Sequence, residues 1–92
     1  MLIKWALRAQ EDLRSILQYF IDEQDEETGQ KLVTSLFSAT ARLENFPLSG
    51  KPSEIKETRE LVLPKLSYIL VYKVNSATVE IISVLHTSKL KD

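Results

Sequence analysis

The sequence contains no cysteine, only two glycines and three prolines, and a single histidine. Without cysteine it has no disulfide framework and no thiolate ligand for zinc, and it is compatible with a reducing compartment. No stretch approaches the roughly 20 consecutive apolar residues that a membrane-spanning helix needs. The opening "MLIKWALRAQEDLRS" turns polar too soon for a signal peptide. We therefore expect a cytoplasmic protein that crosses no membrane and requires no metal or cofactor.

The chain also lacks an excess of either charge. Twelve Lys and Arg residues face 13 Asp and Glu residues, which gives a net charge of −1. Proteins that draw their affinity from nucleic-acid phosphates normally carry a basic surplus, so a broad nucleic-acid interface is disfavoured, although a local basic patch is not. The length of 92 residues predicts one domain, residues 1–92.

What is present is a clear change of hydrophobic period along the chain. A short apolar and aromatic run predicts a strand over 2–5, and two helical stripes then predict amphipathic helices over about 7–24 and 26–46, with Asp25 as the second N-cap. Pro47 ends the second helix, and period-two runs follow over 59–63, 67–74 and 78–86. The order β-α-α-β-β-β predicts an α+β fold in which a helical hairpin packs on an antiparallel sheet.

Both faces of the last two predicted strands are substantially apolar. A two-residue turn at Asn75 and Ser76 would pair Val74 with Ala77 and would separate two sets of side chains. Two helices can cover only one face, so the other face is expected to meet a partner or a second copy of the chain. The uncovered set would carry Ile69, Val71, Lys73, Glu80, Ile82, Val84 and His86.

Five blocks of the sequence, "IKW", "RAQEDL", "LENFPLSGKP", "TRELVLPKLSYILVYKV" and "VEIISVLH", together resemble the RelE/ParE superfamily of bacterial toxins. These are the toxins of type II toxin–antitoxin systems, often called plasmid stabilization proteins. The resemblance implies the fold inferred above and an antitoxin partner whose C-terminal segment folds onto the toxin. Operator DNA would be contacted only indirectly, through the antitoxin. The expected antitoxin-binding residues are Ile69, Val71, Ile82 and Val84.

The resemblance leaves the target to be decided between two branches of the superfamily. Members that cleave mRNA in the ribosome usually carry an arginine directly after the first tyrosine of the "YILVY" strand, and this chain has Ile69 there. The "VLHTSK" ending is similar to that of ParE-type toxins, so we expect a ParE-like toxin that binds DNA gyrase. The alternatives are a ribosome-dependent mRNA endonuclease and an inactive homologue that only binds its antitoxin.

Candidate functional residues follow from these readings. Arg59 and His86 are the candidates for catalysis, because the alternative needs a cation and a group that titrates near neutral pH. The simpler interpretations are an ion pair of Arg59 with Glu57 or a helix carboxylate, and a strand-end histidine bonded to backbone or water. The simpler interpretation of Tyr68 is sheet packing, and that of the C-terminal lysines is a solvated tail. The candidate target contacts are Arg59, Tyr68, Lys73, His86, Lys89 and Lys91.

Overall fold

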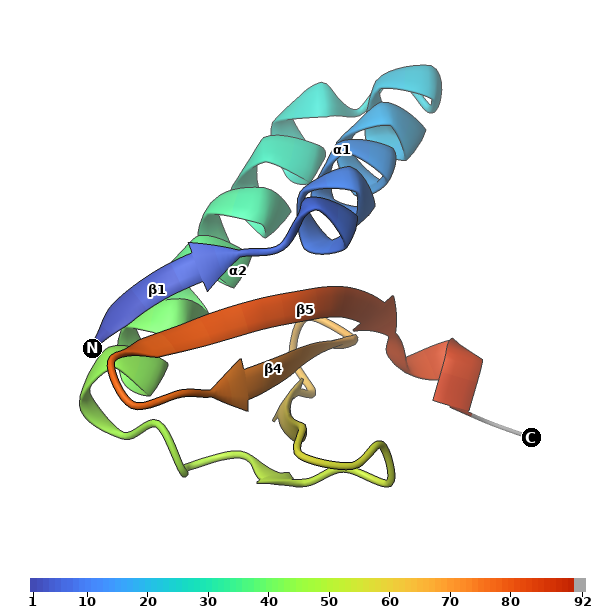
Figure 1. Ribbon diagram of the computed structural model, residues 1–92. Helices are drawn as coiled ribbons and strands as arrows, with labels where there is room; N and C mark the ends of the chain where they lie inside the picture. Colours follow the sequence, from blue (N-terminus) through green and yellow to red (C-terminus); the bar gives the residue numbers. More distant parts are fainter. Residues whose placement is uncertain (91–92) are drawn as a thin grey trace.

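Two helices lie side by side across one face of a five-stranded sheet (Figure 1). The structure is a computed structural model that describes residues 1–90. Its elements, in chain order, are β1 (Leu2–Trp5), α1 (Leu7–Asp22), α2 (Glu26–Asn45), β2 (Lys51–Pro52), β3 (Arg59–Leu63), β4 (Tyr68–Val74), β5 (Thr78–His86) and the short 3₁₀ helix η1 (Thr87–Leu90). No helix in this described part is long and apolar enough to cross a membrane.

The helical hairpin forms where the sequence predicts it. Asp25 occupies the N-cap position of α2 without a side-chain capping bond, while Glu26 and Glu27 lie in the first turn, where the helix dipole favours negative charge. The two helices approach closely at Gly29, because a Cβ there would lie 2.7 Å from Phe20 Cβ. Glycine at this position therefore allows a helix–helix contact that a larger residue would push apart.

The strand order is β1-β5-β4-β3-β2. The predicted α+β fold is confirmed, but the sheet is mixed and not purely antiparallel, because β1 pairs in parallel with β5, Trp5 opposite Ile81. The chain between these two strands, which runs from α1 through β4, supplies the long connection that a parallel pair requires. The edge strand β2 was not predicted, since it has only two residues and one of them is Pro52.

The register of the β4–β5 hairpin differs from the prediction. The turn lies one residue later, with the Asn75 N–H donating to the Thr78 carbonyl at 2.8 Å, so Val74 pairs with Val79. A bulge near Val71 and Tyr72 then leaves Ile82 without a cross-strand partner. Because an extra residue reverses the alternation of side chains, the residues of β5 after the bulge lie on the opposite face from the one expected.

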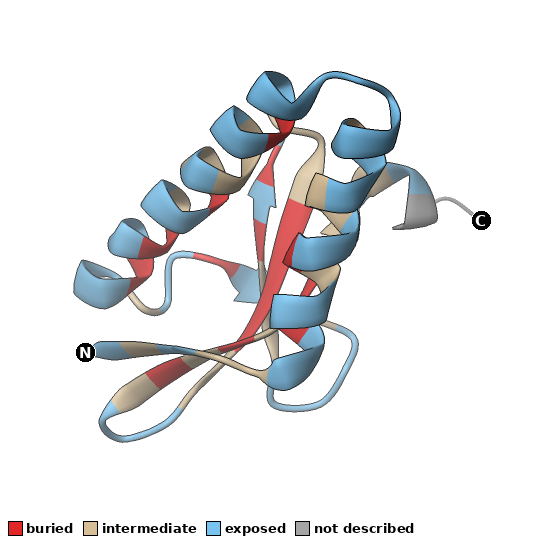
Figure 2. Cartoon of the chain, turned by 90° about the horizontal axis from the view of Figure 1, so that it is seen from above, coloured by how far each residue is buried: buried red, intermediate tan, exposed pale blue. Residues whose placement is uncertain are grey.

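The core lies between the helices and the near face of the sheet, and the buried stretches in Figure 2 face one another across it. Tyr72 and Leu70 from the central strand β4 are fully buried there, with Leu36 and Leu43 from α2. Val84 belongs to this core and pairs with Leu70. The predicted placement of Val84 on the uncovered face is therefore wrong, and the bulge is the reason.

The far face of the sheet is apolar but not widely exposed. Ile69 and Val71 are only 2% and 3% exposed although no helix covers them. Their strand is central, and the neighbouring strands place Val62 and Leu85 on either side of Ile69. Accessible apolar surface on this face is thus confined to its margins, such as Val62 at 37% exposure.

Candidate functional site

Arg59 begins β3 and reaches across to the loop that joins α2 to β2. Its Nε donates to the Gly50 carbonyl at 3.0 Å, and its Nη2 donates to the Leu48 carbonyl at 3.2 Å. Among the described residues it forms no ion pair, with Glu57 or with any helix carboxylate. The interpretation of Arg59 as an ion-pair residue is therefore wrong, and its guanidinium holds a loop in place.

Tyr72 holds the same loop from beneath, a role that the sequence did not indicate. Its hydroxyl accepts the Gly50 N–H at 2.9 Å and donates to the Pro47 carbonyl at 2.8 Å. A Cβ on Gly50 would lie 2.6 Å from both the Tyr72 hydroxyl and the Glu60 carbonyl oxygen. Glycine is thus required by this close approach, and a buried tyrosine hydroxyl needs such partners.

The second candidate cation, Lys73, follows Tyr72 on β4. Lys73 and Arg59 line one hollow of about 610 Å³ at this end of the sheet, whose rim includes Leu48, Pro52 and Glu57. Like Arg59, Lys73 forms no ion pair within residues 1–90. The structure therefore brings together two of the predicted target contacts, and it adds an apolar rim to them.

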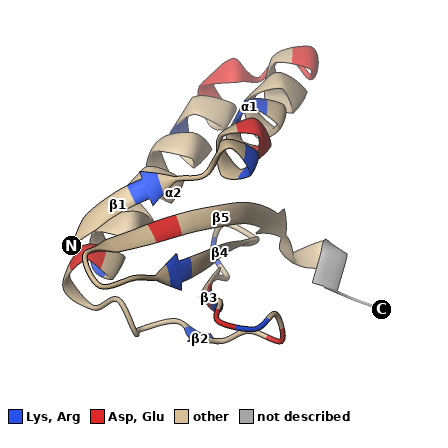
Figure 3. Cartoon of the chain, viewed as in Figure 1, with Lys and Arg blue, Asp and Glu red and all other residues tan. Residues whose placement is uncertain are grey.

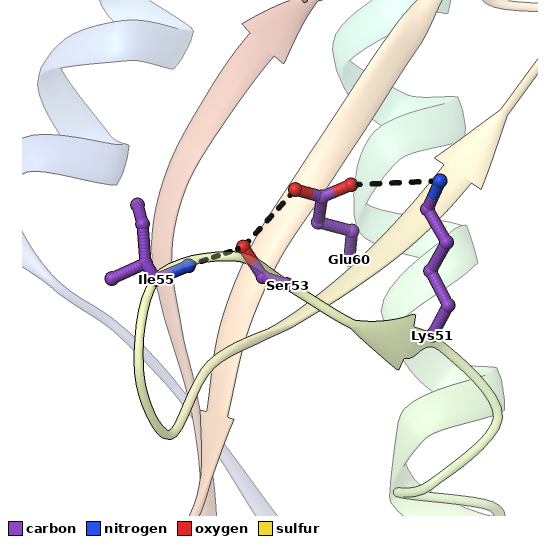
Figure 4. Close-up of polar contacts among 4 residues, drawn as sticks. All are labelled: Lys51, Ser53, Ile55 and Glu60. Carbon is purple, nitrogen blue, oxygen red and sulfur yellow. Dashed lines mark hydrogen bonds and ion pairs between the residues drawn. The ribbon is translucent and has the colours of Figure 1, made fainter.

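The neighbouring carboxylate of Glu60 is already engaged, as Figure 4 shows. The Ser53 hydroxyl donates to Glu60 Oε2 at 3.1 Å, and Lys51 Nζ lies 4.0 Å from Glu60 Oε1. The Ile55 N–H in turn donates to the Ser53 hydroxyl at 3.2 Å. These contacts order the connection between β2 and β3 and direct the charge of Glu60 toward Lys51.

The other predicted pair, Tyr68 and His86, lies at the opposite end of β4. The two residues are cross-strand partners, and their rings meet edge to face with centroids 5.1 Å apart. Burial raises the pKa of Tyr68 above its usual 10.0, and the neighbouring Tyr19 phenol raises it further. Tyr19, Tyr68 and His86 also line two adjoining hollows beside α1.

His86 is committed to the turn that follows it. Its Nδ1 accepts the Ser88 N–H at 3.1 Å and lies 2.8 Å from the Ser88 hydroxyl. These contacts make the imidazole a cap for the first turn of η1. The interpretation of His86 as a strand-end residue bonded to backbone is supported by these contacts. Lys89 lies within η1, and Lys91 lies outside the described residues.

The two catalytic candidates are not brought together. Arg59 pairs with Tyr72 and His86 pairs with Tyr68, so four residue steps of β4 separate them, roughly 13 Å along the strand. A general acid or base must lie within hydrogen-bond reach of the group it serves. Ile69, which follows Tyr68 on β4, is buried at 2% exposure. Among the described residues no cluster of three or more metal-ligating side chains occurs either.

An apolar groove lies on the outer side of the helical hairpin. It has a volume of about 440 Å³, and the rings of Trp5 and Phe37, which both line it, meet in a tilted arrangement with centroids 4.8 Å apart. Phe37 remains 48% exposed, so the hairpin does not cover its own aromatic surface. The amphipathic pattern of the second predicted helix did not indicate this opening. The remaining lining residues are Gln10, Leu13, Arg14, Leu17 and Val33.

The four residues predicted to bind an antitoxin have different environments. Ile69 and Val71 are buried on the far face, and Val84 is buried in the helix-facing core. Only Ile82, the unpaired residue of the bulge, is partly accessible. As antitoxin contacts these residues stay a prediction, although the structure does not present them as one open surface.

The fold is that of a small α+β protein in which a helical hairpin packs on a five-stranded mixed sheet. The comparisons identify the family. Residues 3–90 match the family model described as "ParE toxin of type II toxin-antitoxin system, parDE". The chain belongs to this family of toxins, and membership implies an antitoxin partner.

Individual relatives agree with this assignment. The chain is 40% identical over 84 residues to "Putative toxin Y4kP" of Sinorhizobium fredii, covering 91% of this chain and 85% of that protein. A solved structure titled "Chromosomal ParDE TA system from P. aeruginosa" superposes with a TM-score of 0.83 at 23% identity, over 94% of this chain and 95% of that one. YafQ from E. coli strain BL21(DE3) shares the fold more distantly, with a TM-score of 0.55 and 16% identity over 98% and 97% of the two chains.

Proposed function

We propose that this toxin inhibits growth by binding a macromolecular target, DNA gyrase, and that a cognate antitoxin neutralises it. The observation that supports binding over cleavage is that the candidate catalytic groups already form hydrogen bonds within the protein. Arg59 donates hydrogen bonds to two loop carbonyls, and the Nδ1 of His86 accepts a hydrogen bond from the Ser88 N–H. Cleavage by attack of a 2′-hydroxyl needs a base, an acid and a cation around one phosphate.

The charge distribution also favours a protein target. Acidic residues gather at the tip of the helical hairpin, where α1 runs into α2 (Figure 3). With a net charge of −1, the protein has little long-range attraction toward dense RNA phosphate. An mRNA endonuclease that enters the ribosome would have to overcome both features, so it is the weaker alternative.

The antitoxin is proposed to cover the hairpin groove. A segment with an apolar face would cover the still exposed parts of Trp5 and Phe37, and apolar surface removed from water contributes about 25 cal/mol per Å². The groove replaces Ile69, Val71 and Val84 as the main proposed contact, because those side chains are already buried in the free toxin.

Induced expression of the toxin alone, beside expression together with its antitoxin, tests the proposal. We expect growth arrest only without antitoxin, with a reporter plasmid that loses negative supercoiling while cellular mRNAs stay intact. Codon-linked cuts in mRNA at unchanged plasmid supercoiling would favour the endonuclease. Unimpaired growth would favour an inactive homologue that only binds its antitoxin.

A further inference from the structure

The loop of residues 46–50, between α2 and β2, is fixed by four hydrogen bonds from the sheet. Tyr72 makes two of them, to Gly50 and Pro47, and Arg59 makes two, to Gly50 and Leu48. Three of the five backbone units of the loop are thus tied to side chains that come from neighbouring strands. Such a loop has little freedom to lose on binding, which is the condition for a preorganised contact surface.

This rigid loop displays apolar side chains to solvent. Phe46 is 67% exposed and Leu48 is 65% exposed, although the loop backbone is anchored against the buried Tyr72 hydroxyl. These two side chains are therefore largely uncovered in the folded protein. Apolar residues presented in a fixed place on a surface are typical of protein–protein contacts.

The adjoining hollow has a surplus of positive charge. Leu48 and Pro52 form its apolar rim, and Arg59 and Lys73 line it without an ion pair among the described residues. Glu57 is the one carboxylate in the lining, so the hollow keeps a positive surplus. An occupant that complements it carries a carboxylate next to an apolar side chain.

We infer that the loop of residues 46–50 and the hollow beside it form the surface that docks the protein target of the toxin, through an acidic and apolar segment of that target. The inference rests on the proposed function, in which the toxin acts by binding a protein. A nucleic-acid occupant fits less well, because a phosphate backbone would gain nothing from the exposed Leu48.

Leu48→Ser tests the surface, and Ile55→Ser is its matched control. Ile55 is an equally exposed loop residue, at 64%, but it does not line the hollow. Purified DNA gyrase is the probe. We expect Leu48→Ser and Lys73→Glu each to weaken gyrase binding by about tenfold and to delay growth arrest, as substitutions of central contact residues do. Ile55→Ser should stay within about twofold of the wild-type affinity.

The binding, toxicity and melting measurements distinguish an unfolded variant, a wrong docking surface and a wrong proposed function. Because all three positions are partly or fully exposed, melting temperatures should stay within about 4 °C of wild type, which excludes unfolding as the cause. A toxic wild type with an equally toxic Leu48→Ser would overturn the docking surface and leave the proposed function standing. A wild type that neither binds gyrase nor arrests growth would overturn both. Binding of single-stranded RNA that Lys73→Glu abolishes and Leu48→Ser preserves would assign the hollow to nucleic acid and contradict the inference.

Discussion

Tyr68 and Tyr72 lie toward opposite ends of the central strand β4, and the two side chains have different roles. Tyr72 is fully buried, and its hydroxyl is bonded on both sides to the loop of residues 46–50. Tyr68 is only partly buried, and its ring meets the exposed His86 edge to face. One strand thus builds a rigid support at one end and an open aromatic surface at the other. The role of a tyrosine in a sheet therefore depends on whether its hydroxyl has hydrogen-bond partners.

Gly50→Ala should break the rigid end most severely. The added methyl group would lie 2.6 Å from the Glu60 carbonyl oxygen, which belongs to the backbone of β3 and cannot move aside cheaply. We expect a loss of about 3 kcal/mol in the free energy of unfolding, at the upper end for overpacking. Urea denaturation measures it, with Ser49→Ala, an exposed neighbour, as the control. Equal stabilities for the two variants would mean that the loop is not held as described.

Tyr72→Phe and Tyr68→Phe compare the two ends directly, since each removes one hydroxyl. Loss of the Tyr72 hydroxyl leaves the Gly50 N–H and the Pro47 carbonyl without their partner, which should cost about 2 kcal/mol of stability. Tyr68 has no hydroxyl hydrogen bond in the described part of the structure, so its variant should lose less than about 0.5 kcal/mol. Thermal or urea unfolding of both variants tests this, and similar losses would remove the contrast.

The pH dependence of the unfolding free energy tests the environment of Tyr68, and it is the smallest effect that we expect. Burial and Tyr19 hold the pKa of Tyr68 above its usual 10.0, so the folded protein binds the phenolic proton more tightly than the unfolded chain does. The stabilisation is complete below about pH 10 and is lost as the pH rises through the folded-state pKa. The free energy of unfolding should therefore fall less steeply with alkaline pH in Tyr68→Phe than in the wild type. Parallel profiles would contradict the shift.

Most of the fold could be predicted because its signals are local. The change from helical to alternating period located both helices, and β3 begins at Arg59 and ends at Leu63 as predicted. The short strand β2 carries no such signal, since its two residues form a strand only by pairing with β3. The bulge in β5 is likewise decided by distant contacts. Beyond it, the Val84 N–H donates to the Asp12 carboxylate of α1 at 2.9 Å, a bond between residues far apart in the sequence.

The candidate site could be predicted only in part, for the same reason. Lys73 and Arg59 were selected by residue type, and the structure places them around one hollow. The partners of Arg59 are backbone carbonyls, which no side-chain pattern reveals. Tyr72 was missed because its two partners lie 22 and 25 residues earlier in the chain. Gly50, one of only two glycines, was the available signal, because a glycine often marks a close approach of two backbone segments.

The most direct measurement of the central claim, that this toxin acts by binding its target and not by cutting RNA, is DNA supercoiling by purified gyrase in the presence of the purified toxin. Binding to gyrase predicts that relaxed plasmid stays relaxed as the toxin concentration rises, and that prior addition of the antitoxin restores supercoiling. Full supercoiling at a large molar excess of folded toxin would contradict the account.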